Sequence, residues 1–131
     1  MNRTDVIRAA YERINARDFA GAAGFFAPEG ELSDVLLEGE VVQGRDAILK
    51  QWNERFANAS VVTMLGEMLE VGDTITVVVS YKVYERTSGA PVGQPLIATQ
   101  RFSFRGGLIA RMDTTVLDEV PEELKEFFGV V

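Results

Sequence analysis

The first half of the chain carries apolar residues at helical spacing. Val6, Ile7, Ala10 and Ile14 recur every three or four positions, which predicts one apolar face on an N-terminal helix. Thr4 precedes this face and is expected to cap the helix, because its hydroxyl can accept a hydrogen bond from a free backbone N–H of the first turn.

Two further helices and a strand pair are expected before residue 60. Asp18 should cap a short second helix, FAGAAGFF, which Pro28 would end. The stretch ELSDVLLEGEVVQG is interpreted as a short strand, a turn and an extended return. A third helix begins at the sequence GRD, and Ile48, Trp52 and Phe56 fall four apart on its apolar face.

The second half changes to the period of two that is typical of strands. VVTMLGEMLEVGD and TITVVVSYKVYER predict one hairpin, and LIATQRFSF and LIARMDTTVL predict a second around the turn RGG. Pro121 opens a short last helix, EELKEFF. Helices followed by a run of antiparallel strands predict an α+β fold with the helices on one face of a curved sheet. A pocket for a small molecule is expected between the two layers.

Composition narrows the function classes. The 131 residues are interpreted as one domain spanning 1–131, with 47% hydrophobic residues and a net charge of −7. An acidic surface repels a phosphate backbone, so no nucleic-acid partner is expected. No apolar run approaches the length of a membrane span and no secretory signal is evident, so we expect no membrane partner and a cytoplasmic location.

The chain contains neither histidine nor cysteine. Thiolate nucleophiles, Ser-His-Asp mechanisms and zinc sites built on imidazole or thiolate are therefore excluded. Acid–base chemistry would depend on Asp, Glu, Tyr, Lys or an activated water, and we expect no cofactor and no metal.

Several motifs together resemble a known superfamily. Tyr11, Asp18, the pair at 26–27, the GRDAI at 44–48 and the segment FRGGLIARM follow one another as in nuclear transport factor 2-like proteins, especially the SnoaL-like and ketosteroid isomerase-like branch. The resemblance covers roughly residues 4–118. It implies a cone-shaped, cystatin-like fold in which a curved, mixed but largely antiparallel sheet wraps around three N-terminal helices, with a short C-terminal helix after it.

Asp34 is the candidate catalytic residue. It falls where the resembling ketosteroid isomerases carry the aspartate that moves a proton next to a carbonyl. A carboxylate in an apolar pocket has its anionic form destabilised, so it becomes a stronger base. The alternative is an outward-facing Asp34 in a stretch that is rich in glutamate.

The partner groups of that isomerase site are replaced here. The resemblance places the oxyanion-hole tyrosine at Ala10, one position before Tyr11, and the second acidic donor at Ala98 or Gln100. Gln100 can still donate a hydrogen bond to a carbonyl oxygen. The residues expected to bind a substrate are Tyr11, Trp52, Phe56, Gln100, Phe102 and Met112.

Two functions remain open from the sequence. One is a small-molecule enzyme that uses Asp34 in isomerisation, cyclisation, dehydration or hydrolysis of a hydrophobic substrate, and the other is a binding or interaction module without chemistry. The alternating valine and isoleucine residues on the outer face of the sheet predict a homodimer through that face. Arg111 and Asp113 are expected to form a cross-strand charge pair on the convex side.

Overall fold

A computed structural model describes residues 1–33, 40–117 and 120–128 of the chain. Its elements are α1 (Arg3–Asn15), α2 (Phe19–Ala23), β1 (Phe26–Ser33), β2 (Val41–Gln43), α3 (Arg45–Arg55), β3 (Ala59–Val71), β4 (Thr74–Glu85), β5 (Leu96–Arg105), β6 (Leu108–Val116) and α4 (Glu122–Phe127). None of the helices within the described ranges combines the length and the apolar character needed to cross a membrane.

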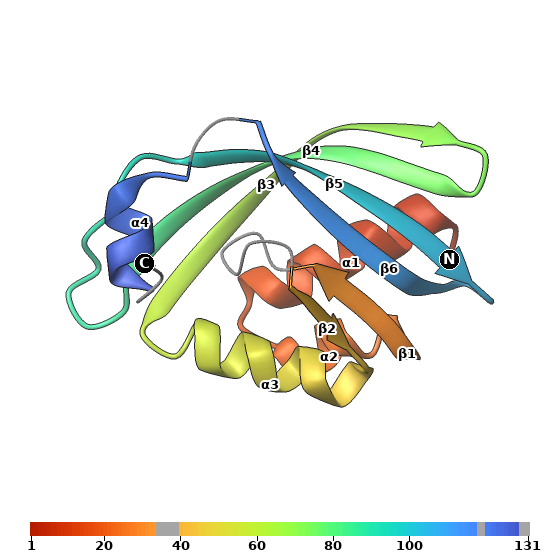
Figure 1. Cartoon of the computed structure of the whole chain (residues 1–131), viewed down its shortest axis with the longest axis horizontal. Coiled ribbons are helices and arrows are strands. Elements are labelled where there is room, and N and C mark those ends of the chain that lie inside the picture. Colours follow the sequence, from red (N-terminus) through yellow and green to blue (C-terminus); the bar gives the residue numbers. More distant parts are fainter. Residues whose placement is uncertain (34–39, 118–119, 129–131) are drawn as a thin grey trace.

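The strands form one mixed sheet in the order β2-β1-β6-β5-β4-β3. All neighbouring pairs are antiparallel except β1 and β6, which run parallel. The sheet curves over α1, α2 and α3, while α4 lies at one end of it (Figure 1). This arrangement confirms the predicted α+β fold with a short C-terminal helix.

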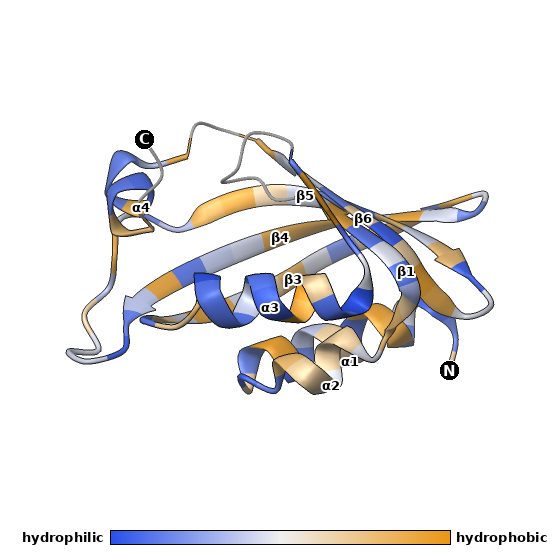
Figure 2. Cartoon of the chain, turned by 60° about the horizontal axis from the view of Figure 1, so that its bottom comes forward, coloured by the Kyte–Doolittle hydropathy of each residue, from blue (hydrophilic) through white to orange (hydrophobic). Residues whose placement is uncertain are grey.

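The main core lies between the concave face of the sheet and the three N-terminal helices. Ile7 of α1, Ile48 of α3, and Ile75 and Phe102 of the sheet are almost fully buried in it. Hydrophobic and hydrophilic residues alternate along the strands, and the helices lie on one side of them (Figure 2). Along β4 the alternating apolar residues that the sequence pattern singled out, beginning with Ile75, are buried on the concave face.

The first helix begins differently from the prediction. Asn2, not Thr4, is the N-cap, and its side-chain oxygen accepts a hydrogen bond from the backbone N–H of Asp5 at 2.9 Å. The Thr4 hydroxyl donates to the same oxygen at 2.8 Å. Asn and Thr are both good caps, so the sequence pattern alone could not distinguish the two positions. The predicted cap at Asp18 is confirmed, because its carboxylate accepts from the backbone N–H of Gly21.

The second helix is shorter than predicted, and the strand after it is longer. α2 ends at Ala23, and β1 begins at Phe26 and runs through Pro28. Pro28 has no N–H to donate to a neighbouring strand, which is why we expected it to lie outside regular structure. The pairing of β1 with β6 shifts register between Phe26 and Glu31, so the proline lies where the ladder is already interrupted.

Tight turns join β3 to β4 and β5 to β6, as predicted. Gly72 connects β3 to β4 with φ +59°, and Gly106 and Gly107 connect β5 to β6 with φ +59° and +80°. These dihedrals lie in the left-handed region, where a side chain would be strained and glycine is not.

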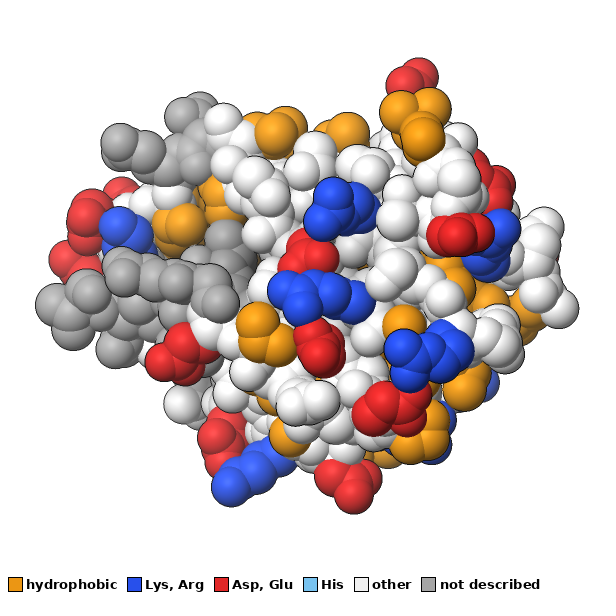
Figure 3. All heavy atoms as spheres, turned by 45° about the vertical axis from the view of Figure 1, so that its right-hand side comes forward, with side chains coloured by type: hydrophobic (Ala, Val, Ile, Leu, Met, Phe, Trp, Pro, Cys, Tyr) orange, Lys and Arg blue, Asp and Glu red, His pale blue; other side chains and the backbone are white. Residues whose placement is uncertain are grey.

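Charged residues on the convex side form a connected row across three strands. Arg111 binds Asp113 on its own strand, with Nε 2.9 Å from Oδ1, and reaches Glu31 on β1. Arg101 on β5 lies 3.8 Å from Asp113. The predicted Arg111–Asp113 pair therefore exists but lies within one strand, because residues two apart share a face, and other residues make the cross-strand contacts. Basic and acidic side chains are interleaved on the face shown in Figure 3.

A side-chain amide fixes the end of α1 against the edge strand β3. The Asn15 amide nitrogen donates to the backbone oxygen of Thr63 at 2.9 Å, and its oxygen accepts from the Thr63 N–H at 2.8 Å. Both backbone groups of a buried edge residue are thereby satisfied without another strand. This double hydrogen bond holds the first helix to the sheet.

We predict that Asn15→Ala lowers the free energy of unfolding by about 2 kcal/mol, since two partly buried backbone groups lose their partner. Urea denaturation measures the change. Asn53→Ala is the matched control, because Asn53 is exposed on α3, and it should change stability by less than about 0.5 kcal/mol. Equal effects of the two substitutions would contradict the assigned role of Asn15.

Candidate functional site

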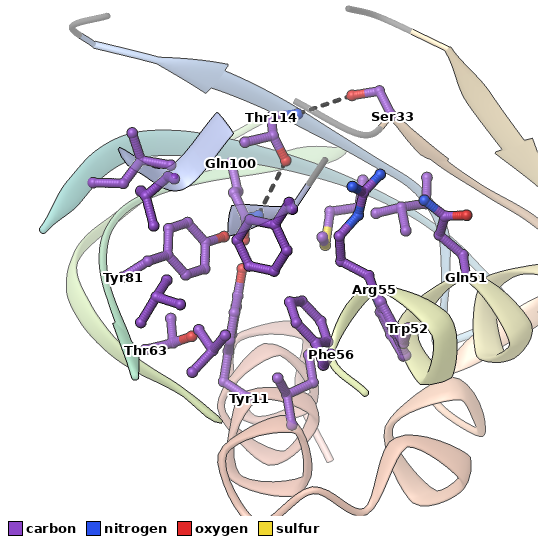
Figure 4. Close-up of a pocket in the computed structure, with 18 residues that line it drawn as sticks. Tyr11, Ser33, Gln51, Trp52, Arg55, Phe56, Thr63, Tyr81, Gln100 and Thr114 are labelled. Atoms are coloured by element: carbon purple, nitrogen blue, oxygen red, sulfur yellow. Dashed lines mark hydrogen bonds between the residues drawn. The ribbon is translucent and has the colours of Figure 1, made fainter. Parts of the chain in front are cut away.

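A pocket opens between the concave face of the sheet and helices α1, α3 and α4. It holds about 850 Å³ of empty space when its open mouth is counted. Eighteen described residues line it (Figure 4). Their side chains are mostly apolar, which is the usual character of a small-molecule site.

Helices supply the aromatic wall of the pocket. Trp52 lies one turn before Phe56 at the end of α3, so both rings face the sheet. Phe56 in turn contacts Phe128, with ring centroids 6.4 Å apart in a T-shaped arrangement. Leu124 of α4 completes this side and is almost fully buried. The C-terminal helix is therefore part of the pocket rather than an appendage.

Strands supply the polar groups. Thr63 on β3 and Tyr81 on β4 are directly paired, and both line the pocket. Gln100 on β5 and Thr114 on β6 are also paired, and the Gln100 amide nitrogen donates to the Thr114 hydroxyl at 3.1 Å. Ser33 at the end of β1 accepts a hydrogen bond from the Thr114 backbone N–H at 3.0 Å.

Most of the residues predicted to bind substrate lie around this pocket. The lining includes Tyr11, Trp52, Phe56, Gln100 and Met112. Phe102 is not among them, because it lies in the core, where its ring meets that of Tyr11 edge-on at 6.3 Å. No bound molecule tests these assignments, so the binding role of each residue stays a prediction.

The helical position of the tyrosine differs from the one implied by the resemblance. Ala10 is buried and absent from the pocket wall, whereas Tyr11 lines it from α1. Ala98 is likewise buried without lining the pocket, whereas Gln100 does line it. The structure therefore resolves which of the alternative positions on α1 and β5 face the cavity.

Asp34, the candidate catalytic residue, lies outside the described residues. Its neighbour in the chain, Ser33, lines the pocket. Among the described lining residues Arg55 is the one that carries a charge, and none is a carboxylate. In the described part of the chain, no group of three or more acidic side chains is arranged to hold a metal ion.

Four polar residues of the lining form what we call the polar cluster: the buried Tyr11, Thr63 and Gln100, and the partly buried Tyr81. Tyr11, Tyr81 and Gln100 point toward one another in Figure 4. Three of its atoms have no hydrogen bond of normal geometry to any described residue: the Tyr11 hydroxyl, Thr63 Oγ1 and Gln100 Oε1. An unsatisfied buried polar group costs about 1–3 kcal/mol, so the cluster lowers the stability of the ligand-free fold.

Burial dominates the acid–base character of the two tyrosines. It raises the pKa of Tyr11 well above the ordinary value, and the neighbouring Tyr81 raises it further. Burial also raises the pKa of Tyr81, although hydrogen bonding from Tyr11 and Gln100 partly opposes the shift. Both hydroxyls are therefore neutral donors at ordinary pH, and the cluster disfavours a negative charge placed beside it.

Several lining residues were not predicted from the sequence. Thr63 and Thr114 alternate with outward residues on their strands, so the period of two contained a signal for them, but nothing distinguished them from core positions. Gln51 and Arg55 lie on a turn of α3 beside Trp52, which was expected in the site. The contribution of α4 had no signal in the sequence, because it depends on how the chain end folds back.

Comparison with known proteins identifies relatives of this architecture. The family model of the SnoaL-like domain matches residues 7–112. A putative polyketide cyclase from Sinorhizobium meliloti is 28% identical, with a TM-score of 0.64, over 88% of this chain and 100% of that chain. A comparison with curated protein sequences finds no significant match.

Two solved structures share the fold at lower identity. A protein with a ketosteroid isomerase-like fold from Catenulispora acidiphila, in complex with trimethylamine, is 16% identical with a TM-score of 0.77, over 96% of this chain and 93% of that chain. RV0760c from Mycobacterium tuberculosis, in complex with estradiol-17beta-hemisuccinate, is 13% identical with a TM-score of 0.74, over 89% and 93% of the two chains. The predicted superfamily and its cone-shaped fold are confirmed.

The buried tyrosines predict a loss of stability at alkaline pH. Above about pH 10 the unfolded chain releases tyrosine protons that the folded chain keeps, so the free energy of unfolding falls as pH rises. Tyr81→Phe removes one such group and should make the fall less steep, by up to about 1.4 kcal/mol per pH unit at the alkaline end. Urea denaturation between about pH 9 and about pH 11 measures this slope. Parallel pH profiles of the two proteins would contradict the prediction.

Proposed function

The chain belongs to the SnoaL-like domain family, and we propose that it binds a small hydrophobic molecule in its pocket and acts on it by acid–base chemistry. The observation that carries this proposal is the pocket itself, an apolar cavity with a few convergent polar groups. Aromatic walls bind the body of such a molecule, and the polar cluster orients it.

Relatives support a ligand of this kind. RV0760c binds estradiol-17beta-hemisuccinate, an apolar ring system with a charged extension, and the Sinorhizobium meliloti protein is described as a putative polyketide cyclase. The same fold thus accommodates bulky, largely apolar molecules. The mostly apolar lining of the present pocket agrees with this class of ligand.

We assign the role of base to Asp34. It directly follows Ser33, whose side chain lines the pocket and accepts a hydrogen bond from the Thr114 N–H. A carboxylate that enters an apolar cavity at this point would be a strengthened base. Isomerisation, cyclisation, dehydration and hydrolysis can each use such a base, and the neutral hydroxyls of Tyr11 and Tyr81 can donate hydrogen bonds to an oxygen of the ligand.

One observation favours a second candidate function, a ligand-binding module without chemistry. No carboxylate is present among the described lining residues, and neither Ala98 nor Gln100, the two positions at which the resemblance places an acid, is one. An amide donates a hydrogen bond but does not transfer a proton. Catalysis would therefore depend on Asp34 without an acidic partner.

The substitution Asp34→Asn separates the two candidates. Exchange of the protons next to the carbonyl of 2-tetralone in D₂O, followed by NMR, reports a base in the pocket whatever the natural reaction is. We expect the protein to accelerate exchange and Asp34→Asn to lower that rate about 100-fold or more, because the amide cannot accept the proton.

The matched control is Asp73→Asn, in the exposed turn between β3 and β4, which should leave the exchange rate unchanged. Melting temperatures of both variants verify that the fold is intact. If Asp34→Asn exchanges 2-tetralone protons as fast as the unmodified protein, Asp34 is not the base. If the unmodified protein gives no acceleration while still binding the ketone, the module without chemistry is favoured.

We also propose a homodimer through the outer face of the sheet. Val62, Met64, Val78 and Ile97 on β3, β4 and β5 are 44%, 59%, 40% and 40% exposed, and they alternate with residues that face inward. Ser80 pairs with both Met64 and Ile97, so these side chains lie in adjacent rows. An apolar surface of this extent is stabilised when a second copy covers it.

Light scattering on a size-exclusion column tests the dimer. The unmodified chain should elute with the mass of two copies, and Met64→Glu should shift it to one copy, because a charge buried without a partner opposes association. Val41→Glu is the control, since Val41 is also exposed but lies on β2 at the opposite edge of the sheet. A single-copy mass for the unmodified protein would contradict the proposal.

A further inference from the structure

If the proposed ligand-binding function holds, the polar cluster also determines which hydrogen-bonding group the hydrophobic ligand carries. Gln100, Tyr11 and Thr63 are 2%, 4% and 5% exposed, yet each has a polar atom that makes no hydrogen bond of normal geometry in the described structure. Buried polar side chains in folded proteins are nearly always satisfied. Three exceptions on the wall of one pocket indicate that a ligand supplies the missing partners.

The chemistry of each unsatisfied atom limits what that partner can be. Gln100 Oε1 is a carbonyl oxygen, which only accepts hydrogen bonds, while its amide nitrogen is engaged by Thr114 at 3.1 Å. The hydroxyls of Tyr11 and Thr63 each have a proton to donate. A complementary ligand group must therefore donate one hydrogen bond and accept another.

A hydroxyl group meets both requirements with a single oxygen atom. A ketone or an ether accepts a hydrogen bond from Tyr11 but leaves Gln100 Oε1 unsatisfied, and a hydrocarbon satisfies neither residue. The difference between these ligands should be large, because a buried site built to bond a hydroxyl discriminates strongly against analogues that lack it.

The charge of the ligand at this point is also restricted. The raised pKa values of Tyr11 and Tyr81 arise mainly from burial, so the same surroundings destabilise any anion placed beside them. Gln100 Oε1 would in addition face a carboxylate oxygen with no proton between them. A neutral hydroxyl avoids both penalties.

The other lining residues of the pocket determine what the rest of the ligand can be. Trp52, Phe56 and Phe128 present aromatic rings, and Leu124 and Met112 present aliphatic side chains to the same space. We propose that the pocket takes an uncharged aromatic or alicyclic alcohol or phenol, whose hydroxyl donates to Gln100 and accepts from Tyr11. The polar cluster is in this account the specificity-determining part of the site.

A series of naphthalene probes tests the proposal by isothermal titration calorimetry near neutral pH. The probes are 2-naphthol, 2-methoxynaphthalene, naphthalene and 2-naphthoate, which share a ring system and differ in donor, acceptor and charge. We expect 2-naphthol to bind about tenfold or more tightly than each of the others, because it alone satisfies both partners without a charge.

The variant Gln100→Leu should remove this preference. It should lower the affinity for 2-naphthol about tenfold while leaving naphthalene bound as tightly as before or more tightly. Tyr11→Phe is a second variant, which removes the donor and should lower the affinity for 2-naphthol and 2-methoxynaphthalene together. The matched control is Gln43→Leu on β2, an exposed glutamine outside the pocket, which should keep the preference intact. The melting temperature of each variant is measured as well. A value equal to or above that of the unmodified protein shows that a loss of affinity does not result from unfolding.

The outcomes distinguish this inference from the proposed function. Equal binding of 2-naphthol, 2-methoxynaphthalene and naphthalene, or tighter binding of 2-methoxynaphthalene or 2-naphthoate, would overturn the hydroxyl assignment while leaving a hydrophobic pocket. A preference for 2-naphthol that persists in Gln100→Leu and Tyr11→Phe would also overturn it. Failure of all four probes to bind would contradict the small-molecule pocket as well.

Discussion

A helix is less than half as long as a strand with the same number of residues, and the pocket follows from this difference. β3 and α1 both contain 13 residues, but the strand spans about 43 Å and the helix about 20 Å. α1 and the 11-residue α3 therefore cover only part of the concave face. Aromatic residues at the end of α3 and the short helix α4 border the uncovered part of the concave face. They do not fill it, so a pocket remains there.

On the part of the concave face that the helices leave uncovered, the residues favour binding at the expense of stability. Elsewhere the concave face consists of residues such as Ile75, Val77 and Val79, which are buried and apolar. In the pocket the same strands carry Tyr81 and Gln100. Polar groups that lower the stability of the empty fold are typical of a site whose partner arrives from outside. The location of the polar cluster therefore supports a binding function independently of any relative.

The sequence predicted the fold better than the site, for physical reasons. Strand faces follow from a period of two, and the turn glycines from their dihedral requirement, so β3 to β6 were correctly predicted. The start of β1 was not, because Pro28 ends a helix in one context and lies at a strand irregularity in another. Distinguishing Tyr11 from Ala10, or Phe102 from Gln100, requires knowledge of which buried positions adjoin empty space. That information exists only after the layers have packed.

Methyl NMR of methionine tests most directly whether the space between the layers receives a small molecule. Met112 lines the pocket, whereas Met64 lies on the outer face and Met1 at the exposed N-terminus, so the chain contains its own reference signals. With labelled methionine methyl groups, naphthalene should shift the Met112 resonance and give contacts between its methyl group and the ring protons, with Met1 and Met64 unmoved. Shifts confined to Met64, or no shift at saturating naphthalene, would contradict a ligand pocket under the sheet.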